Sequence, residues 1–220
     1  MKKAVILLSG GQDSTTCLYL AKDKFDLHAI GFDYKQSHKQ ELIQAKEICD
    51  SLNIPYKVFN VQDLLASSSL INHTDHNEKS KVNNDLPASF TSGRNLLFLT
   101  IAGSYCAEIG ASDIITGVCQ TDYSGYPDCR KNTMDALQLT LSLGLGIGDI
   151  RIHTPLMYLT KAETWKLAKE LNCLGVIIEK TMTDYNGSMN KNEWGYGDIN
   201  NPASELRAKG FYEAKEKGWI

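Results

Sequence analysis

Residues 4–14 read AVILLSGGQDS, and this stretch sets the expectation for the whole fold. The apolar run at residues 4–8 is far shorter than the ~20 residues of a membrane helix, and it leads into a pair of glycines. A short apolar run that ends in a glycine turn is typical of a buried strand rather than of a signal peptide. We therefore expect a strand at residues 4–8, a tight turn after it, and a helix at residues 14–21.

The alternation of strand and helix continues along the chain. Apolar runs predict further strands at residues 28–34, 56–61, 112–118 and 151–154. The spacing of apolar residues predicts further helices at residues 39–52, 96–109, 132–143, 160–171 and 203–217. This order implies an α/β, Rossmann-like fold, a parallel sheet with helices on both faces. We expect one domain over residues 1–180 and a small C-terminal loop and helix segment over residues 181–220.

Composition narrows the class of protein. The chain has 220 residues, 23 Lys+Arg and 26 Asp+Glu, so its formal net charge is −3. This balance counts against nucleic acid as a partner, because such a partner normally calls for a basic patch. No apolar run is long enough to span a membrane. The six cysteines include no C-x-x-C pair, which favours reduced thiols and a cytoplasmic location.

The hexapeptide SGGQDS at residues 9–14 has the features of a phosphate-binding loop. Glycines let the backbone approach an anion closely, and a helix N-terminus offers unpaired N–H groups. The alternative is a plain tight turn with a helix cap. Asp13 beside an anion would hold a cation such as Mg²⁺ or orient the loop. The residues expected to contact the phosphates are Ser9, Gly10, Gly11, Gln12, Asp13 and Ser14.

A second polar stretch, GVCQTDYSGYPDCR at residues 117–130, follows the strand predicted at residues 112–118. The carboxyl end of a parallel strand is where such a sheet presents its ligand site. Amide, carboxylate, phenol and guanidinium groups gathered there would suit a flat polar heterocycle, whereas the alternative is a solvated loop. The candidate substrate-binding residues are Gln120, Asp122, Tyr123, Tyr126, Asp128 and Arg130.

The hexapeptide resembles the signature of the PP-loop ATP pyrophosphatases, which adenylate their substrates. Together with residues 34–38, 93–95, 117–130, 155–156 and 160–161, the chain is similar to the family of 7-cyano-7-deazaguanine synthases over nearly its whole length. The resemblance implies an ATP-dependent C–N ligase of queuosine-type 7-deazaguanine biosynthesis. Such an enzyme converts 7-carboxy-7-deazaguanine and ammonia to the nitrile through an adenylated acid and then an amide, with release of AMP and pyrophosphate. It also implies ATP and Mg²⁺ as cofactors and a homodimer.

The resemblance and simple chemistry assign further roles. Lys161 matches the family lysine that neutralises charge in the transition state, although a lysine is more often a surface residue. Arg94 could bind a phosphate or the substrate carboxylate with two hydrogen bonds. With Asp13 these two residues form the expected catalytic set. His38 could move a proton or be structural, and the polar residues 67–92 could form a lid or a tolerated insertion.

The C-terminal segment departs from the family pattern. The family's zinc knuckle has cysteines where this chain places Asp184, Asp198, Asn201 and Ser204. Oxygen ligands would not form a comparable tetrahedral zinc site. We therefore expect no metal there, and hydrogen bonds among these four side chains in its place.

Two other functions remain open from the sequence. One is a PP-loop ATP-dependent enzyme that acts on another nucleobase or on tRNA. The other is a non-catalytic nucleotide-binding relative, which the missing zinc ligands favour and the intact loop at residues 9–14 counts against.

Overall fold

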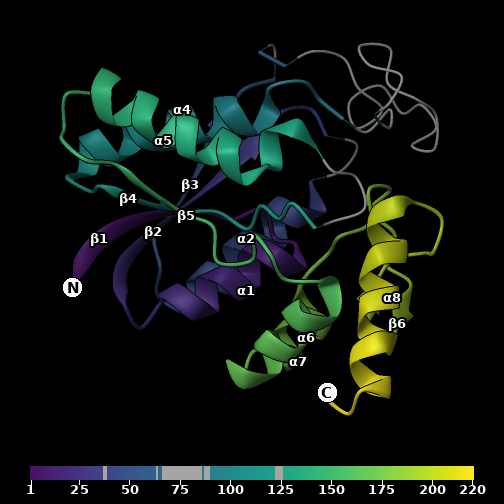
Figure 1. Ribbon diagram of the computed structural model, residues 1–220. Coiled ribbons are helices and arrows are strands. Elements are labelled where there is room, and N and C mark those ends of the chain that lie inside the picture. The colour runs from purple at the N-terminus through teal and green to yellow at the C-terminus, as the bar shows by residue number, and fades with distance from the viewer. Residues whose placement is uncertain (37–38, 63, 66–85, 87–89, 122–125) are drawn as a thin grey trace.

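The computed structural model describes residues 1–36, 39–62, 64–65, 86, 90–121 and 126–220 (Figure 1). His38, Asp122 and Tyr123 lie outside the described residues, as does most of the stretch 67–92. The functional expectations placed on them remain predictions.

The centre of the fold is a five-stranded parallel sheet in the order β3-β2-β1-β4-β5. Its strands are β1 (Lys2–Leu7), β2 (Phe25–Asp33), β3 (Tyr56–Asn60), β4 (Asp113–Ile115) and β5 (Arg151–His153). β1 is central and pairs with both β2 and β4; Val5 lies opposite His28 on one side and opposite Ile114 on the other. The strand order changes direction at β1, and in open parallel sheets ligands bind outside the carboxyl ends of the strands at such a point.

Helices cover both faces of the sheet, as predicted (Figure 1). The helices that follow the strands are α1 (Gln12–Ala21), α2 (Gln40–Ser51), α4 (Arg94–Ile109), α5 (Lys131–Gly144) and α6 (Lys161–Glu170), and the 3₁₀ turn η1 (Pro127–Cys129) precedes α5. Alternate residues of β1 pack on opposite faces of the sheet. Ile6 packs in one cluster with Leu18 and Ile48, whereas Val5 packs in the other with Leu99. Burial on both faces explains why residues 4–8 are uniformly apolar.

Some boundaries differ from the prediction where tertiary contacts decide them. β4 ends at Ile115 rather than at residue 118. There the chain bends toward the loop at residues 9–14, so that a Cβ on Gly117 would lie 3.0 Å from the backbone nitrogen of Ser14. β2 begins at Phe25, three residues before the predicted start, because its pairing with β1 extends back to Lys2.

The C-terminal part contains more structure than the sequence predicted. It holds α7 (Leu174–Lys180), a small antiparallel pair β6 (Lys191–Asn192) and β7 (Gly195–Tyr196), and α8 (Pro202–Glu216). α8 lies beside α6 (Figure 1). Trp165 of α6, Trp194 and Phe211 of α8 belong to one buried cluster. The predicted division of the chain into a domain at residues 1–180 and a segment at residues 181–220 therefore stays a prediction. Of the helices in the described part of the chain, none is both long and apolar enough to cross a membrane.

Candidate active site

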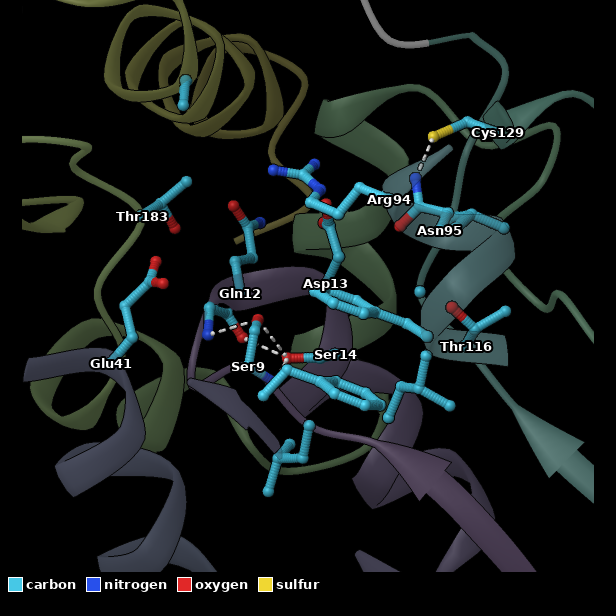
Figure 2. A pocket seen from close by; sticks show the side chains of 18 of the residues that line it. Ser9, Gln12, Asp13, Ser14, Glu41, Arg94, Asn95, Thr116, Cys129 and Thr183 are labelled. Atoms are coloured by element: carbon cyan, nitrogen blue, oxygen red, sulfur yellow. Dashed lines mark hydrogen bonds between the residues drawn. The ribbon is translucent and has the colours of Figure 1, made fainter. Parts of the chain in front are cut away.

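A cavity of about 320 Å³ opens at the carboxyl ends of the central strands (Figure 2). Leu8 after β1, Phe32 of β2 and Thr116 after β4 form part of its wall. The cavity therefore lies where the strand order changes direction, the position at which a parallel sheet gathers side chains from separate loops.

The loop at residues 9–14 forms one side of this cavity. Gly10 has a φ of +93°, and a Cβ there would collide with the backbone oxygen of Glu41, so that only glycine fits. The hydroxyl oxygens of Ser9 and Ser14 are 3.1 Å apart, and the Gly11 N–H donates to Ser9 Oγ at 3.3 Å. These bonds hold a tight turn at the N-terminus of α1, where backbone N–H groups favour an anion.

Asp13 and Lys161 meet at this loop although they are 148 residues apart in the chain. Lys161 Nζ lies 2.8 Å from Asp13 Oδ2, and the lysine side chain is only 9% exposed. Lys161 is the first residue of α6, which begins with a capping box formed by Thr160 and Glu163. The other oxygen, Asp13 Oδ1, is buried and has no hydrogen-bond partner among the described residues. It is available to a cation or to a ligand.

The side-chain amide of Gln12 is the clearest indication that the cavity binds a polar ligand. The side chain is 2% exposed, and neither its Oε1 nor its Nε2 has a partner within the described part of the chain. It lines the cavity and points into it (Figure 2). Buried polar groups in proteins are nearly always hydrogen-bonded, and an unpaired one costs on the order of 1–3 kcal/mol.

Arg94 stands on the opposite wall from the loop (Figure 2). It is the first residue of α4 and follows Gly93, whose φ is +74°. Burial alone would lower the pKa of Arg94, but Tyr34, Tyr185 and Tyr126 around the guanidinium, together with a nearby carboxylate, raise it on balance. Arg94 is thus a fixed positive charge in an aromatic setting, which suits a planar anion.

Glu41 also lines the cavity, and the sequence analysis missed it. Burial raises the pKa of Glu41 to about 8; Arg94 acts in the opposite direction and Asp184 adds to the rise. In the sequence Glu41 is an acidic residue near the predicted start of a helix, which normally means a solvated first turn. The one available signal was its place shortly after a strand, at the ligand-binding edge of the sheet.

The residues predicted to bind substrate separate into two groups. Tyr126 lines the cavity. The Gln120 side chain instead accepts a hydrogen bond from the Lys131 N–H at 3.1 Å, at the start of α5. The buried carboxylate of Asp128 accepts one from the Asn95 N–H at 3.0 Å, at the start of α4. Gln120, Asp128 and Arg130 are not part of the cavity wall as the described residues form it.

Of the four residues predicted to replace the family's zinc ligands, three form a hydrogen-bonded cluster with their side chains, and the fourth, Asp198, joins it only through its backbone. Asp184, Asn201 and Ser204 are fully buried. Ser204 Oγ donates to Asp184 Oδ2 at 3.1 Å, and the Ser204 N–H donates to Asn201 Oδ1 at 3.1 Å, which caps α8. Asp198 contributes its backbone N–H to Asp184 at 2.8 Å, while its carboxylate accepts from Asn190. The expected network exists for three side chains, and that of Asp198 turns outward.

A parallel sheet that changes direction at β1, a serine- and glycine-rich loop at a helix N-terminus, and a buried lysine beside that loop define an α/β ATP pyrophosphatase of the PP-loop class. A family model described as "Queuosine biosynthesis protein QueC" matches residues 3–215, and the chain belongs to this family. The resemblance stated from the sequence is confirmed.

Curated relatives agree with the family. A 7-cyano-7-deazaguanine synthase of Clostridium botulinum strain 657 is 44% identical over 219 residues, which cover 98% of this chain and 97% of the relative. One from strain Kyoto is 44% identical over 215 residues, covering 96% and 95%. Among solved structures, the NMN synthetase from Francisella tularensis is 17% identical with a TM-score of 0.51, covering 97% of this chain and 85% of that one. This last similarity concerns the fold alone. The chain thus belongs to a family of biosynthetic enzymes, and the predicted fold is confirmed.

Proposed function

We propose that the protein is an ATP-dependent ligase that converts 7-carboxy-7-deazaguanine and ammonia to 7-cyano-7-deazaguanine. The acid is first adenylated with release of pyrophosphate, and ammonia displaces AMP to give an amide. Adenylation of the amide oxygen by a second ATP then lets this oxygen leave as AMP, which gives the nitrile. Membership of the family and the names of the relatives support the reaction. The observation that carries it is the cavity, in which the loop at residues 9–14 lies next to the partly buried Asp13–Lys161 pair.

The loop is the proposed site of the ATP pyrophosphate group. Backbone N–H groups and the hydroxyls of Ser9 and Ser14 would bind the phosphate oxygens. Lys161 would offset the negative charge that develops as pyrophosphate leaves the α-phosphorus. Its low exposure makes this charge more effective than that of a surface lysine.

Asp13 fits a magnesium ion as a second partner. Oδ1 is unpaired among the described residues, while Oδ2 is held by Lys161. The described residues contain no group of three or more His, Cys, Asp or Glu that could hold a metal. Mg²⁺ would therefore be bound largely by the ATP phosphates with Asp13 as a protein ligand, an arrangement that this ion favours. The ion would supply charge neutralisation on the phosphates.

Arg94 is the proposed partner of the substrate carboxylate. Its guanidinium can form two parallel hydrogen bonds with a carboxylate and so orient one oxygen for attack. Tyr126 and the stacked rings of Phe32 and Phe98, whose centroids are 4.0 Å apart, give the cavity a flat aromatic wall. Such a wall suits a planar deazapurine.

The direct test is to incubate the purified protein with 7-carboxy-7-deazaguanine, ammonium and Mg-ATP. We expect the nitrile by mass spectrometry and AMP rather than ADP by chromatography. Omitting ammonium should stop the reaction at the adenylated acid. Formation of ADP, or the absence of both amide and nitrile from a folded protein, would exclude the proposal.

The cytoplasm as location and a homodimer as assembly are further parts of the proposal. The dimer rests on the family resemblance and is tested by light scattering at micromolar concentration. A mass near 24.4 kDa would contradict it, and one near twice that value would support it.

A further inference from the structure

A buried arginine of α8 reaches the wall of the cavity. Arg207 is fully buried, and its guanidinium donates to four neutral oxygens: Trp194 O at 3.1 Å, Ile177 O at 2.8 Å, Thr183 Oγ1 at 2.9 Å and Thr181 O at 3.4 Å. Burial lowers the pKa of Arg207 to about 10, and the charge of Asp13 acts in the opposite direction. The group thus stays protonated at neutral pH and can only donate.

The contact with Arg207 fixes the role of the Thr183 hydroxyl. Arginine has no acceptor, so Thr183 Oγ1 must accept in this bond, and its own hydrogen must point elsewhere. Among the described residues no acceptor for that hydrogen is found. Thr183 lines the cavity, and Figure 2 shows its side chain on the same side as Gln12. A free hydroxyl donor therefore faces the cavity.

This donor lies beside the loop at residues 9–14. A Cβ on Gly11 would be 3.9 Å from Thr183 Oγ1 and 3.4 Å from Met182 O. The Met182 N–H donates to Gly10 O at 3.1 Å, which ties the C-terminal segment to the loop. The hydroxyl and the N–H groups of the loop thus border the same space.

Gln12 is an independent indication that a polar ligand binds in this space. Its amide is 2% exposed, aimed into the cavity, and unpaired within the described residues. Lys161 and Arg207 add positive charge on two sides of the loop. An anion is the ligand that would satisfy these donors together.

We infer that Thr183 donates its hydroxyl hydrogen to the pyrophosphate group of ATP, and that Arg207 is a positioning residue that orients this hydroxyl. The C-terminal segment then completes the phosphate site that the loop begins. This inference rests on the proposed function, because it takes the loop at residues 9–14 to be the pyrophosphate site.

The test is calorimetric binding of inorganic pyrophosphate with Mg²⁺ to the full-length protein. Thr183→Val keeps the shape and removes the donor, so the affinity should fall about tenfold to a hundredfold, as expected for a hydrogen bond to a charged group. Thr183→Ser keeps the donor and should bind within about threefold of the original protein. Thr181→Val is the matched control, because that buried hydroxyl already donates to Ile177 O at 2.6 Å. Its affinity should not change.

Arg207 is tested through its dependence on Thr183. Arg207→Lys should weaken pyrophosphate binding in the original protein and have little further effect in the Thr183→Val background. Equal losses in both backgrounds would show that Arg207 does not act through Thr183.

Two results would overturn the role of Thr183 itself. One is unchanged pyrophosphate affinity in a folded Thr183→Val protein. The other is an equal loss in Thr183→Ser, which would point to packing. If the original protein does not bind pyrophosphate at all, the proposed function fails instead.

Discussion

Two buried polar clusters, one at the cavity and one in the C-terminal segment, use similar residue types and differ in where their hydrogen bonds go. Asp184, Asn201 and Ser204 bond to one another or to nearby backbone. At the cavity, the Gln12 amide and Asp13 Oδ1 have no partner within the described residues. A fully paired cluster stabilises the fold, whereas an unpaired one is a cost that a ligand can remove. The pairing of a buried polar group therefore separates structural residues from binding residues better than its residue type does.

The largest effect is expected at the contact between Asp13 and Lys161. Lys161→Met should lower kcat at least about 100-fold, because it removes the charge proposed to offset the leaving pyrophosphate. The reaction with 7-carboxy-7-deazaguanine measures this. Lys46→Met is the control: Lys46 pairs with Asp50 on the exposed side of α2 and should leave kcat unchanged. A Lys161→Met protein with normal kcat would remove Lys161 from the site.

Substitutions in the paired cluster of the C-terminal segment should lower the stability of the fold rather than the rate of the reaction. Asp184→Ala leaves the Ser204 hydroxyl and the N–H groups of Asn186 and Asp198 without their acceptor. We expect a loss of about 3 kcal/mol in the free energy of unfolding, which corresponds to a fall of roughly 6–12 °C in Tm. Asp198→Ala should cost far less, since the residue is only half-buried and its carboxylate bonds to Asn190 outside the cluster. Equal effects of the two substitutions in a melting experiment would contradict the distinction between them.

Features of the fold and the site that depend on neighbouring residues could be predicted from the sequence, whereas those that depend on contacts between distant segments could not. The strand predicted at residues 4–8, the loop after it and the alternation of strands and helices depend on local pattern; the structure bears them out, with β1 at Lys2–Leu7. Glu41 and Arg207 look like ordinary helix residues in the sequence. Glu41 lines the cavity because α2 begins against Gly10, and Arg207 because α8 lies beside α6 and packs against Gly195. Such contacts leave no local signal.

The direction of a side chain was equally beyond the sequence. The spacing of Asp184, Asp198, Asn201 and Ser204, aligned with the zinc ligands that the family resemblance implies, predicted that four side chains would meet. Gly197 has a φ of +132° and brings the backbone of Asp198 to Asp184, so that the Asp198 side chain points away. Spacing along the chain fixes which residues come near one another, whereas local backbone angles fix which side chains face inward.

Glu41, a residue of the cavity wall, should make the stability of the protein depend on pH. Its pKa is raised to about 8 by burial, so the folded protein holds a proton there that the unfolded chain has lost. Stability should therefore fall as pH rises from about 4.3 toward 8, because the folded state binds more protons in that window. Glu41→Gln should remove this slope and be more stable than the original protein at pH 8 by about 4 kcal/mol. Unfolding by urea at several pH values measures it; parallel curves for the two proteins would contradict the burial of the charge.

A smaller gain in stability is expected at Gln12. Gln12→Met keeps the length of the side chain and removes two unpaired polar atoms, so the ligand-free protein should gain about 1 kcal/mol, or 2–4 °C in Tm. The same variant should bind Mg-ATP more weakly, because the ligand loses a hydrogen-bonding partner. Higher stability together with lower affinity would mark Gln12 as a binding residue. Lower stability would show that the amide is paired within the folded chain after all.

The smallest expected effect, no change at all, concerns zinc in the C-terminal segment. A structural zinc in a knuckle supplies on the order of 10 kcal/mol of apparent binding free energy. The bonds from Ser204 to Asp184 and Asn201, at about 1 kcal/mol each, recover a small part of that. Burial of Trp194 in one cluster with α6 adds apolar packing, worth about 3–5 kcal/mol on the scale of a tryptophan-to-alanine change. The segment thus has its own means of holding its shape, and its oxygen atoms are occupied by hydrogen bonds. We therefore expect protein purified without chelator to hold far less than one zinc per chain by elemental analysis, and its Tm to stay the same with and without a strong chelator. A tightly held zinc, or a Tm lowered by the chelator, would contradict this expectation. It would mean that these oxygen atoms coordinate a metal ion instead of forming hydrogen bonds within the cluster.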